Sequence, residues 1–276
     1  MNLLKNLGFM QGRLSPTKKN KIQFFPEKHW KREFKLASIL GLKNLEWTLD
    51  YKNLLKNPIF NDKGKKNIKY LCSKYKVEIK SLTGDCFMQK PFWEQKKKEK
   101  YINYLKKIIN ACGVLNIKFI IFPLVDKSSI KNSKIENIII NELRKITYLL
   151  KKNKLMLLFE SDYNPKKLKN FIEKFDTKYF AINYDMGNSA SMGYDVNEEF
   201  LNYGKYIKNI HIKDRLFKGK TVRLGYGNVN FEAVFKNIEK INYNNLLIFQ
   251  TARSIKKNKD FDELKKNFNF IKNYLN

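Results

Sequence analysis

The chain has little of several residue types that define other classes of protein. Three cysteines and two histidines occur in 276 residues, and no two cysteines form a CxxC pair. This pattern supports neither a disulfide framework nor a structural zinc site, so a reducing compartment is expected. No apolar run approaches the roughly 20 residues that a membrane helix needs, and Lys5 and Asn6 interrupt the apolar start of the chain. We therefore expect a cytoplasmic protein that does not bind membranes.

Arginine is also scarce, although the chain is strongly basic. The 56 basic residues give a formal net charge of +30 against 26 acidic residues, and all but six of them are lysine. The lysines are scattered through helix-like stretches, and no nucleic-acid recognition motif accompanies them. We therefore expect no nucleic-acid partner. The positive potential would instead help to attract a small anionic substrate.

Short apolar runs alternate with longer stretches in which apolar residues recur every three or four positions, which is typical of consecutive strand–helix units. The short runs are predicted to be strands at Leu7 to Gln11, Asn44 to Leu49, Val77 to Leu82, Phe119 to Leu124, Met156 to Phe159, Phe180 to Tyr184, Ile207 to Ile212 and Leu246 to Phe249. The longer stretches are predicted to be helices at Trp30 to Leu40, Lys66 to Lys76, Trp93 to Ala111, Ile135 to Leu150, Pro165 to Phe175, Asn197 to Tyr206, Phe231 to Ile238 and Phe261 to Tyr274.

Eight strand–helix units without a signal for an antiparallel hairpin favour a closed (β/α)8 barrel, the TIM barrel, over an open sheet. The segment RLGYGN holds Gly225 and Gly227 but not the third glycine of a dinucleotide-binding fingerprint, so these glycines are interpreted as a turn. A barrel of this kind commonly uses about 250 residues as one domain. We therefore assign residues 1–276 to a single TIM-barrel domain of the α/β class.

The last four predicted strands each end in a polar side chain that could ligate a metal. These residues are Glu160, Asp185, His211 and Gln250. Because functional side chains of a barrel come from the carboxyl ends of its strands, the four are expected to converge. Each carboxylate alone could instead cap a helix or pair with a lysine, but their conjunction with one of only two histidines favours a metal site. Mn²⁺ is expected there, with Mg²⁺, Co²⁺ and Zn²⁺ as alternatives.

A family resemblance runs from Gly8 to Arg253. The phrases that carry it are GFMQGRLSP, EFKLASILGLKNLEW, LFESD, INYDMGNSASMGYD, HIKDR and LGYGNVNFEAVF. Together they resemble the sugar phosphate isomerase/epimerase group of xylose isomerase-like TIM barrels. The resemblance implies a divalent metal held by Glu, Asp, His and Glu, which chelates neighbouring carbonyl and hydroxyl oxygens of a ketose or aldose. Carried over to this chain, the ligands are Glu160, Asp185, His211 and Gln250.

Gln250 departs from the family pattern, which commonly has a second glutamate there. An amide oxygen can ligate a metal but cannot accept a substrate proton. In the epimerases that the chain resembles, two glutamates act on opposite faces of the carbon being inverted. Glu160 alone could still move a proton between C1 and C2 through an enediolate stabilised by the metal, which is aldose–ketose isomerisation. If metal ligation occupies Glu160, Asp214 or Lys213 is the next candidate base.

Five further residues are predicted to contact the substrate. Arg13, Arg215 and Arg253 lie at or just after strand ends, where a guanidinium group could bind a phosphate or carboxylate bidentately. A salt bridge across the barrel mouth is the alternative for each arginine. Trp47 could stack on the apolar face of a sugar ring. Asn188, in the loop expected after the sixth strand, completes the predicted set.

The leading functional prediction is a metal-dependent isomerase or epimerase acting on a sugar or sugar phosphate. A dehydratase is a close alternative, because the same enediolate can expel a β-hydroxyl group. A non-catalytic sugar-binding barrel is a second alternative, because Gln250 replaces a glutamate. The DNA-repair endonucleases of this barrel type use three zinc ions and several histidines, which two histidines cannot supply. A homodimer is possible, but no apolar stripe in the sequence marks an interface.

Overall fold

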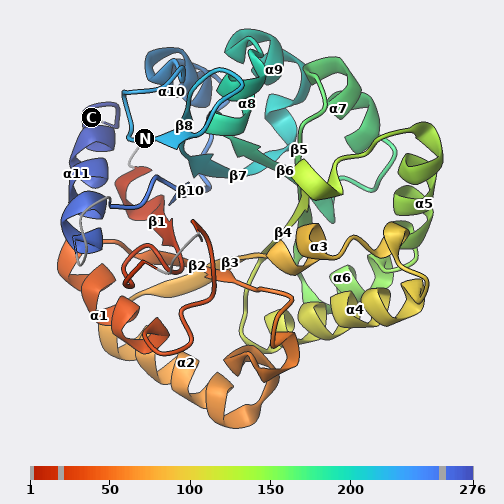
Figure 1. Ribbon diagram of the computed structural model, residues 1–276, viewed down its shortest axis with the longest axis horizontal. Helices are drawn as coiled ribbons and strands as arrows, with labels where there is room; N and C mark the ends of the chain where they lie inside the picture. The colour runs from red at the N-terminus through yellow and green to blue at the C-terminus, as the bar shows by residue number, and fades with distance from the viewer. Residues whose placement is uncertain (1–2, 18–21, 255–258, 276) are drawn as a thin grey trace.

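A computed structural model describes residues 3–17, 22–254 and 259–275. Its centre is a closed barrel of parallel strands in which β1 pairs with both β2 and β10 (Figure 1). The barrel strands are β1 (Leu7–Met10), β2 (Asn44–Thr48), β3 (Glu78–Thr83), β4 (Phe119–Leu124), β5 (Met156–Ser161), β6 (Phe180–Asp185), β7 (Ile207–Ile212) and β10 (Leu246–Phe249). The predicted (β/α)8 fold is confirmed. The extreme ends of the predicted single domain, residues 1–2 and 276, lie outside the described residues.

Most of the helices surround the ring of strands in Figure 1. They are α1 (Trp30–Leu40), α2 (Asp62–Tyr75), α3 (Asp85–Gln89), α4 (Lys98–Val114), α5 (Ser133–Arg144), α6 (Thr147–Asn153), α7 (Pro165–Ile172), α8 (Met186–Met192), α9 (Val196–Tyr203), α10 (Phe231–Lys240) and α11 (Asp260–Lys272). Their apolar faces pack on the outward-facing strand residues and form one large hydrophobic core. Within the described part of the chain, no helix combines the length and apolar character needed to cross a membrane.

The barrel interior changes from apolar to polar along the strands. Side chains of a strand alternate between its two faces, so residues two apart share a face. On β10, Leu246 and Ile248 form a small apolar cluster with Met10, separate from the large core. By the same alternation, the side chain of Gln250, one residue beyond the end of β10, lies on the same face as those of Leu246 and Ile248. The apolar cluster therefore fills one part of the interior, and polar side chains gather toward the carboxyl ends of the strands.

Three features depart from the sequence prediction. The stretch predicted as one helix from residue 135 to 150 is two helices, α5 and α6, and at the break the Thr147 hydroxyl donates to the Arg144 carbonyl at 2.8 Å, a local bond of the kind that competes with helical hydrogen bonds. The segment after β6 is the helix α8, in which Asp185 Oδ1 accepts from the Asn188 N–H at 2.8 Å. The expectation of no antiparallel hairpin was wrong, because β8 (Asp214–Arg215) pairs antiparallel with β9 (Thr221–Val222).

Candidate metal centre

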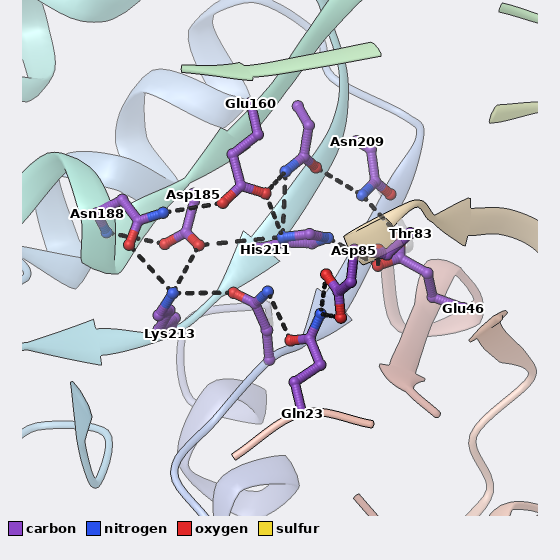
Figure 2. A network of polar contacts seen from close by, with 12 residues as sticks. Gln23, Glu46, Thr83, Asp85, Glu160, Asp185, Asn188, Asn209, His211 and Lys213 are labelled. Carbon is purple, nitrogen blue, oxygen red and sulfur yellow. Dashed lines mark hydrogen bonds and ion pairs between the residues drawn. The ribbon is translucent and has the colours of Figure 1, made fainter. Parts of the chain in front are cut away.

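Three of the predicted ligands lie together at the carboxyl end of the barrel (Figure 2). The strand register pairs Asp185 of β6 with His211 of β7, and Glu160 comes from the neighbouring strand β5. One potential ligand atom from each of the three residues lies within 4.8 Å of those of the other two. All three side chains are buried. The structure thus brings these three residues together as expected, while metal binding itself stays a prediction.

The orientation of His211 suits a metal ligand. Its Nε2 atom lies 2.8 Å from Glu46 Oε1, and its Nδ1 atom lies 3.2 Å from Glu160 Oε2 and 4.0 Å from Asp185 Oδ2. When Nε2–H donates to a carboxylate, Nδ1 is the nitrogen that can ligate a metal, which would then replace the contact of Nδ1 with Asn183 Nδ2 at 3.1 Å. Burial lowers the pKa of His211, but the charges and hydrogen bonds of Glu46 and Glu160 outweigh burial and raise it to about 10. A metal would therefore displace a proton from His211 on binding.

Buried amide and hydroxyl groups fix the two glutamates beside this imidazole. Asn183 Nδ2 donates to Glu160 Oε2 at 2.9 Å. Asn209 Nδ2 donates to Asn183 Oδ1 at 2.7 Å and to Glu46 Oε2 at 3.2 Å, and the Thr83 hydroxyl donates to Glu46 Oε1 at 2.5 Å. Burial raises the pKa of Glu46, but the charge of the imidazole and these hydrogen bonds outweigh burial and lower it. Glu46 is therefore a buried anion held in one orientation.

Lys213 forms the next part of the cluster. Its ammonium group donates to Asp185 Oδ2, Asn188 Oδ1 and Gln250 Oε1, each at 3.1 Å. Asn188 Nδ2 in turn donates to Glu160 Oε1 at 2.9 Å. Gln250 thus joins the cluster through Lys213, and its role as a fourth metal ligand stays a prediction. The Lys213 ammonium group therefore contacts one of the three clustered residues, Asp185, directly and lies where it can bind a substrate oxygen.

The donor set fits a divalent cation. Glu160 and Asp185 supply carboxylate oxygens, and His211 supplies an imidazole nitrogen whose second nitrogen has a fixed partner. Such mixed oxygen and nitrogen sets bind Mn²⁺, Co²⁺ and Zn²⁺, and carboxylate oxygens also suit Mg²⁺. Three protein ligands leave coordination positions for oxygens of a substrate. The residues present are therefore compatible with the metal expected from the sequence.

Arg13 and Arg253 bind backbone carbonyl groups. Arg13 donates to Thr251 O at 2.9 Å and to Ile22 O at 3.1 Å, and Arg253 donates to two carbonyls in the loop after β1. Burial, together with the charge of Arg253, lowers the pKa of Arg13 to about 9. Both arginines therefore connect the loop that follows β1 with the loop that follows β10. Their predicted contact with a substrate phosphate stays a prediction.

Arg215 lies closer to the cluster. Its Nη1 donates to Asn188 Oδ1 at 2.8 Å, while Nε and Nη2 donate to Gly219 O at 3.0 and 2.8 Å. The Asn188 oxygen therefore accepts from both Arg215 and Lys213. Substrate binding by Arg215 and Asn188 stays a prediction, and their contact with Lys213 places them beside the candidate site.

The stacking role predicted for Trp47 is incompatible with its place in the structure. Its exposed fraction is 0%, and its ring packs against those of Phe25 and Trp30 at centroid distances of 5.4 and 5.5 Å. Its Nε1–H donates to Asn57 Oδ1 at 3.0 Å. A ring enclosed in this way has no face for a sugar. Trp47 is a core residue, and its polar atom has a partner.

Asp214 has a structural role in place of the base role considered for it. Its buried carboxylate accepts from the backbone N–H groups of Gly225, Gly227 and Val229, at 2.9, 2.9 and 3.2 Å. Gly227 is required for this approach, because a Cβ atom there would lie 2.1 Å from Asp214 Oδ1. The two glycines of RLGYGN thus form a turn, as expected, and the turn wraps around the buried side chain of Asp214.

Several residues of the site escaped the sequence prediction. Glu46, Asn183 and Asn209 line the cluster, and Gln23 and Asp85 form a hydrogen-bonded pair beside it. The period-two alternation of a strand could have identified two of them, since residue 183 shares a face with 185, and residue 209 shares a face with 211. Asp85 follows the third predicted strand, the same kind of position that identified the other site residues. Nothing in the local sequence of Gln23 marks it, because loop geometry brings it to the site.

Solved structures share this fold across almost the whole chain. D-psicose 3-epimerase from Clostridium cellulolyticum H10, crystallised with D-tagatose, superimposes with a TM-score of 0.74 at 11% sequence identity, covering 98% of this chain and 99% of the epimerase. The IOLI protein, whose structure holds a zinc atom, gives a TM-score of 0.74 at 13% identity, again covering 98% of this chain and 99% of that one. At these identities the likeness establishes a common fold.

Sequence comparison gives one partial relative and one family. The uncharacterized protein MJ1311 of Methanocaldococcus jannaschii is 25% identical over 114 residues, which are 40% of this chain and little more than a third (36%) of that protein. The family described as xylose isomerase-like TIM barrel matches residues 34–274, from α1 through the last described helix. The closed parallel barrel and the match over most of the sequence agree with each other. The chain therefore belongs to the xylose isomerase-like TIM barrel family.

Proposed function

We propose that this protein is a divalent-metal-dependent sugar isomerase or epimerase, which moves a proton at a carbon atom next to a carbonyl group. The observation that carries the proposal is the buried cluster of Glu160, Asp185 and His211, with the Nδ1 atom of the imidazole directed at both carboxylates. Family membership and the epimerase among the structural neighbours support it. The substrate class is a sugar or a sugar phosphate.

Glu160, Asp185 and His211 would hold the metal, for which Mn²⁺ is the first candidate and Mg²⁺, Co²⁺ and Zn²⁺ are alternatives. The zinc atom in the structure of the IOLI protein supports a metal in this barrel type. When bound, the cation would polarise a sugar carbonyl as a Lewis acid and so acidify the neighbouring C–H bond. The remaining chemistry falls to side chains of the chain itself.

Glu160 is the proposed base. Its two oxygens accept from Asn183 at 2.9 Å and from Asn188 at 2.9 Å, so the carboxylate is held in one orientation from both ends. Preorganisation of this kind lowers the cost of placing a base against a substrate C–H bond. Burial of the carboxylate also keeps bulk water from competing for the proton.

Lys213 is the proposed partner of the developing negative charge. Its ammonium group is held by three oxygen acceptors at 3.1 Å and is only partly buried. A substrate oxygen could replace one of these acceptors, and a fixed cation there would stabilise an enediolate as it forms. Gln250 keeps the ammonium group in place, because its amide oxygen is one of the three acceptors.

The test is incubation of metal-loaded protein in D₂O with D-fructose, D-tagatose, D-psicose, D-ribulose, D-xylulose and their phosphates. NMR spectra would report deuterium at carbons next to the carbonyl and any new sugar. We expect exchange and conversion of at least one sugar by the wild type, loss of conversion in Glu160→Gln, and normal activity in the control Glu232→Gln, which changes an exposed glutamate.

Other outcomes identify the alternatives. Release of a dehydrated product would indicate a lyase that uses the same first proton transfer. Saturable binding of a sugar without deuterium entry would indicate a barrel that binds sugars and does not convert them. Wild-type activity in Glu160→Gln would contradict the assignment of the base.

A further inference from the structure

A second carboxylate lies beside the cluster on an element that the proposed mechanism does not use. Asp85 is the first residue of α3, directly after β3, and is 4% exposed. Both of its oxygens lie 2.6 Å from Gln23 Nε2. Gln23 Oε1 in turn accepts from Gln250 Nε2 at 3.1 Å, and Gln250 Oε1 accepts from Lys213. One carboxamide group, that of Gln23, therefore separates Asp85 from the residue that replaces the second family glutamate.

We propose that Asp85 is the second acid/base of the site and acts on the substrate face opposite Glu160, so that the protein inverts a carbon atom by a two-base mechanism. This inference rests on the proposed function and specifies it as epimerisation. In the view of Figure 2, Asp85 and Glu160 lie on opposite sides of the row formed by Asp185 and His211. A sugar that displaced the Gln23 carboxamide would meet the carboxylate on one side and Glu160 on the other.

The surroundings of Asp85 do not explain it as a structural residue. The N-cap position of α3 is Gly84, which makes no side-chain capping bond. Within residues 3–17, 22–254 and 259–275, the Asp85 carboxylate has hydrogen bonds to Gln23 and no ion pair within 4.0 Å. Burying a carboxylate against one neutral amide is costly unless the group serves another purpose. This carboxylate is therefore a candidate for chemistry.

The electrostatics of Asp85 agree with an acid/base role. Burial raises its pKa, and the charges of Asp50 and Glu160 raise it further against the hydrogen bond from Gln23 and the charge of Arg13, to about 7. At neutral pH the group would then exist in both protonated and ionised forms. A group with a pKa near the working pH can donate a proton in one direction of a reaction and accept one in the other.

Glu160 removes the proton from the carbon next to the carbonyl, and the electron pair of that C–H bond enters the enediolate. The O–H bond of protonated Asp85 then breaks as its proton forms a new C–H bond on the opposite face of the same carbon. Asp85 ends as a carboxylate, Glu160 ends protonated, and exchange of both with solvent restores the starting state. Gln250 could not perform this step, because an amide has no proton acceptor of suitable basicity.

The experiment follows the epimer pair that the wild type interconverts in D₂O, drawn from the five sugars named above and their phosphates. We expect Asp85→Asn to invert neither sugar, while Glu160 still exchanges deuterium into the one epimer whose C–H bond faces it. Glu160→Gln should show the reverse, with exchange confined to the other epimer. The experiment with Glu160→Gln tests the role of Asp85 without changing that residue. It therefore remains informative even if Asp85→Asn fails to fold. Asp162→Asn changes another carboxylate at this end of the barrel and should invert normally.

Inversion by Asp85→Asn at the wild-type rate would overturn the inference, as would absence of exchange from both epimers in Glu160→Gln. A wild type that interconverts an aldose and a ketose without inverting any carbon would also overturn it, while leaving the proposed function intact. A wild type that neither exchanges nor converts any sugar in the panel would refute the proposed function itself. Equal metal content and equal melting temperature in the variants would show that the losses come from chemistry.

Discussion

Glu46 is predicted to act on a bound metal through His211. Its carboxylate has an exposed fraction of 0% and lies 2.8 Å from His211 Nε2, where it favours a proton on Nε2 and leaves the lone pair of Nδ1 for a metal. Glu46→Gln keeps the volume of the side chain and one oxygen, which can accept either from Thr83 or from Asn209, because these two groups donate to different oxygens of Glu46. It removes the negative charge and allows the amide group to turn its NH₂ toward the imidazole, which would favour the wrong tautomer.

The expected magnitude follows from the position of Glu46 behind a ligand. Loss of such a partner typically weakens metal binding by about 10- to 100-fold. This corresponds to about 1.4–2.8 kcal/mol of binding free energy. Competition of the metal-free protein with a chromogenic chelator for Mn²⁺ or Zn²⁺ would measure the dissociation constant. The melting temperature, recorded without metal, would show whether the fold is retained.

The matched control is Glu33→Gln. Glu33 is also fully buried, but it accepts from the backbone N–H groups of Gly12 and Leu14 instead of contacting the imidazole. Burial raises the pKa of Glu33 to about 7, against the hydrogen bonds that lower it. We expect this variant to change stability and leave metal affinity unchanged. Equal metal affinity in wild type and Glu46→Gln would refute the claim that Glu46 orients the ligand.

Three further predictions follow from the same geometry. Because the pKa of His211 is raised to about 10, a metal must displace its proton below that pH, so metal affinity should rise by roughly one log unit per pH unit between about pH 6 and 9. Calorimetry in buffers of different ionisation enthalpy would detect the released proton, and a metal affinity that does not change with pH would contradict the prediction. Asp214→Ala should lower the free energy of unfolding, measured in urea, by at least about 3 kcal/mol, because three backbone N–H groups lose their buried acceptor. Unchanged stability with lost activity would instead support Asp214 as a base. Gln250→Glu should raise metal affinity about tenfold by adding a carboxylate to the ligand set, since the charge of the ligands affects metal affinity. An unchanged metal affinity in a chelator titration would show that residue 250 does not ligate the metal.

The fold was predictable because the strands and helices carry strong, regular patterns. All eight barrel strands were located, and α1 was predicted at its observed bounds, Trp30–Leu40. The segment from residue 186 to 192 lies between a predicted strand and a predicted helix and was assigned to neither, yet α8 forms where Asp185 caps it. The β8–β9 hairpin is two residues long on each strand, too short to produce an alternation in the sequence.

The site was predictable where strands carry it and unpredictable where loops do. Glu160, Asp185 and His211 converge because parallel strands of one barrel end at the same side. The roles of Trp47 and Asp214 depended on which neighbours surround them, and only the three-dimensional packing shows that one is enclosed by aromatic rings and the other by backbone N–H groups. Polar residues at strand ends therefore identified the centre of the site, but not which of its neighbours support the fold.

Elemental analysis of untagged protein by mass spectrometry, with wild type and His211→Ala compared after gel filtration, would test the metal centre without any substrate. We expect near-stoichiometric divalent metal in the wild type, either as purified or after incubation with Mn²⁺, Co²⁺ or Zn²⁺, and its loss in His211→Ala. Absence of metal from the wild type under all of these conditions, or equal metal in both proteins, would contradict a metal centre formed by Glu160, Asp185 and His211.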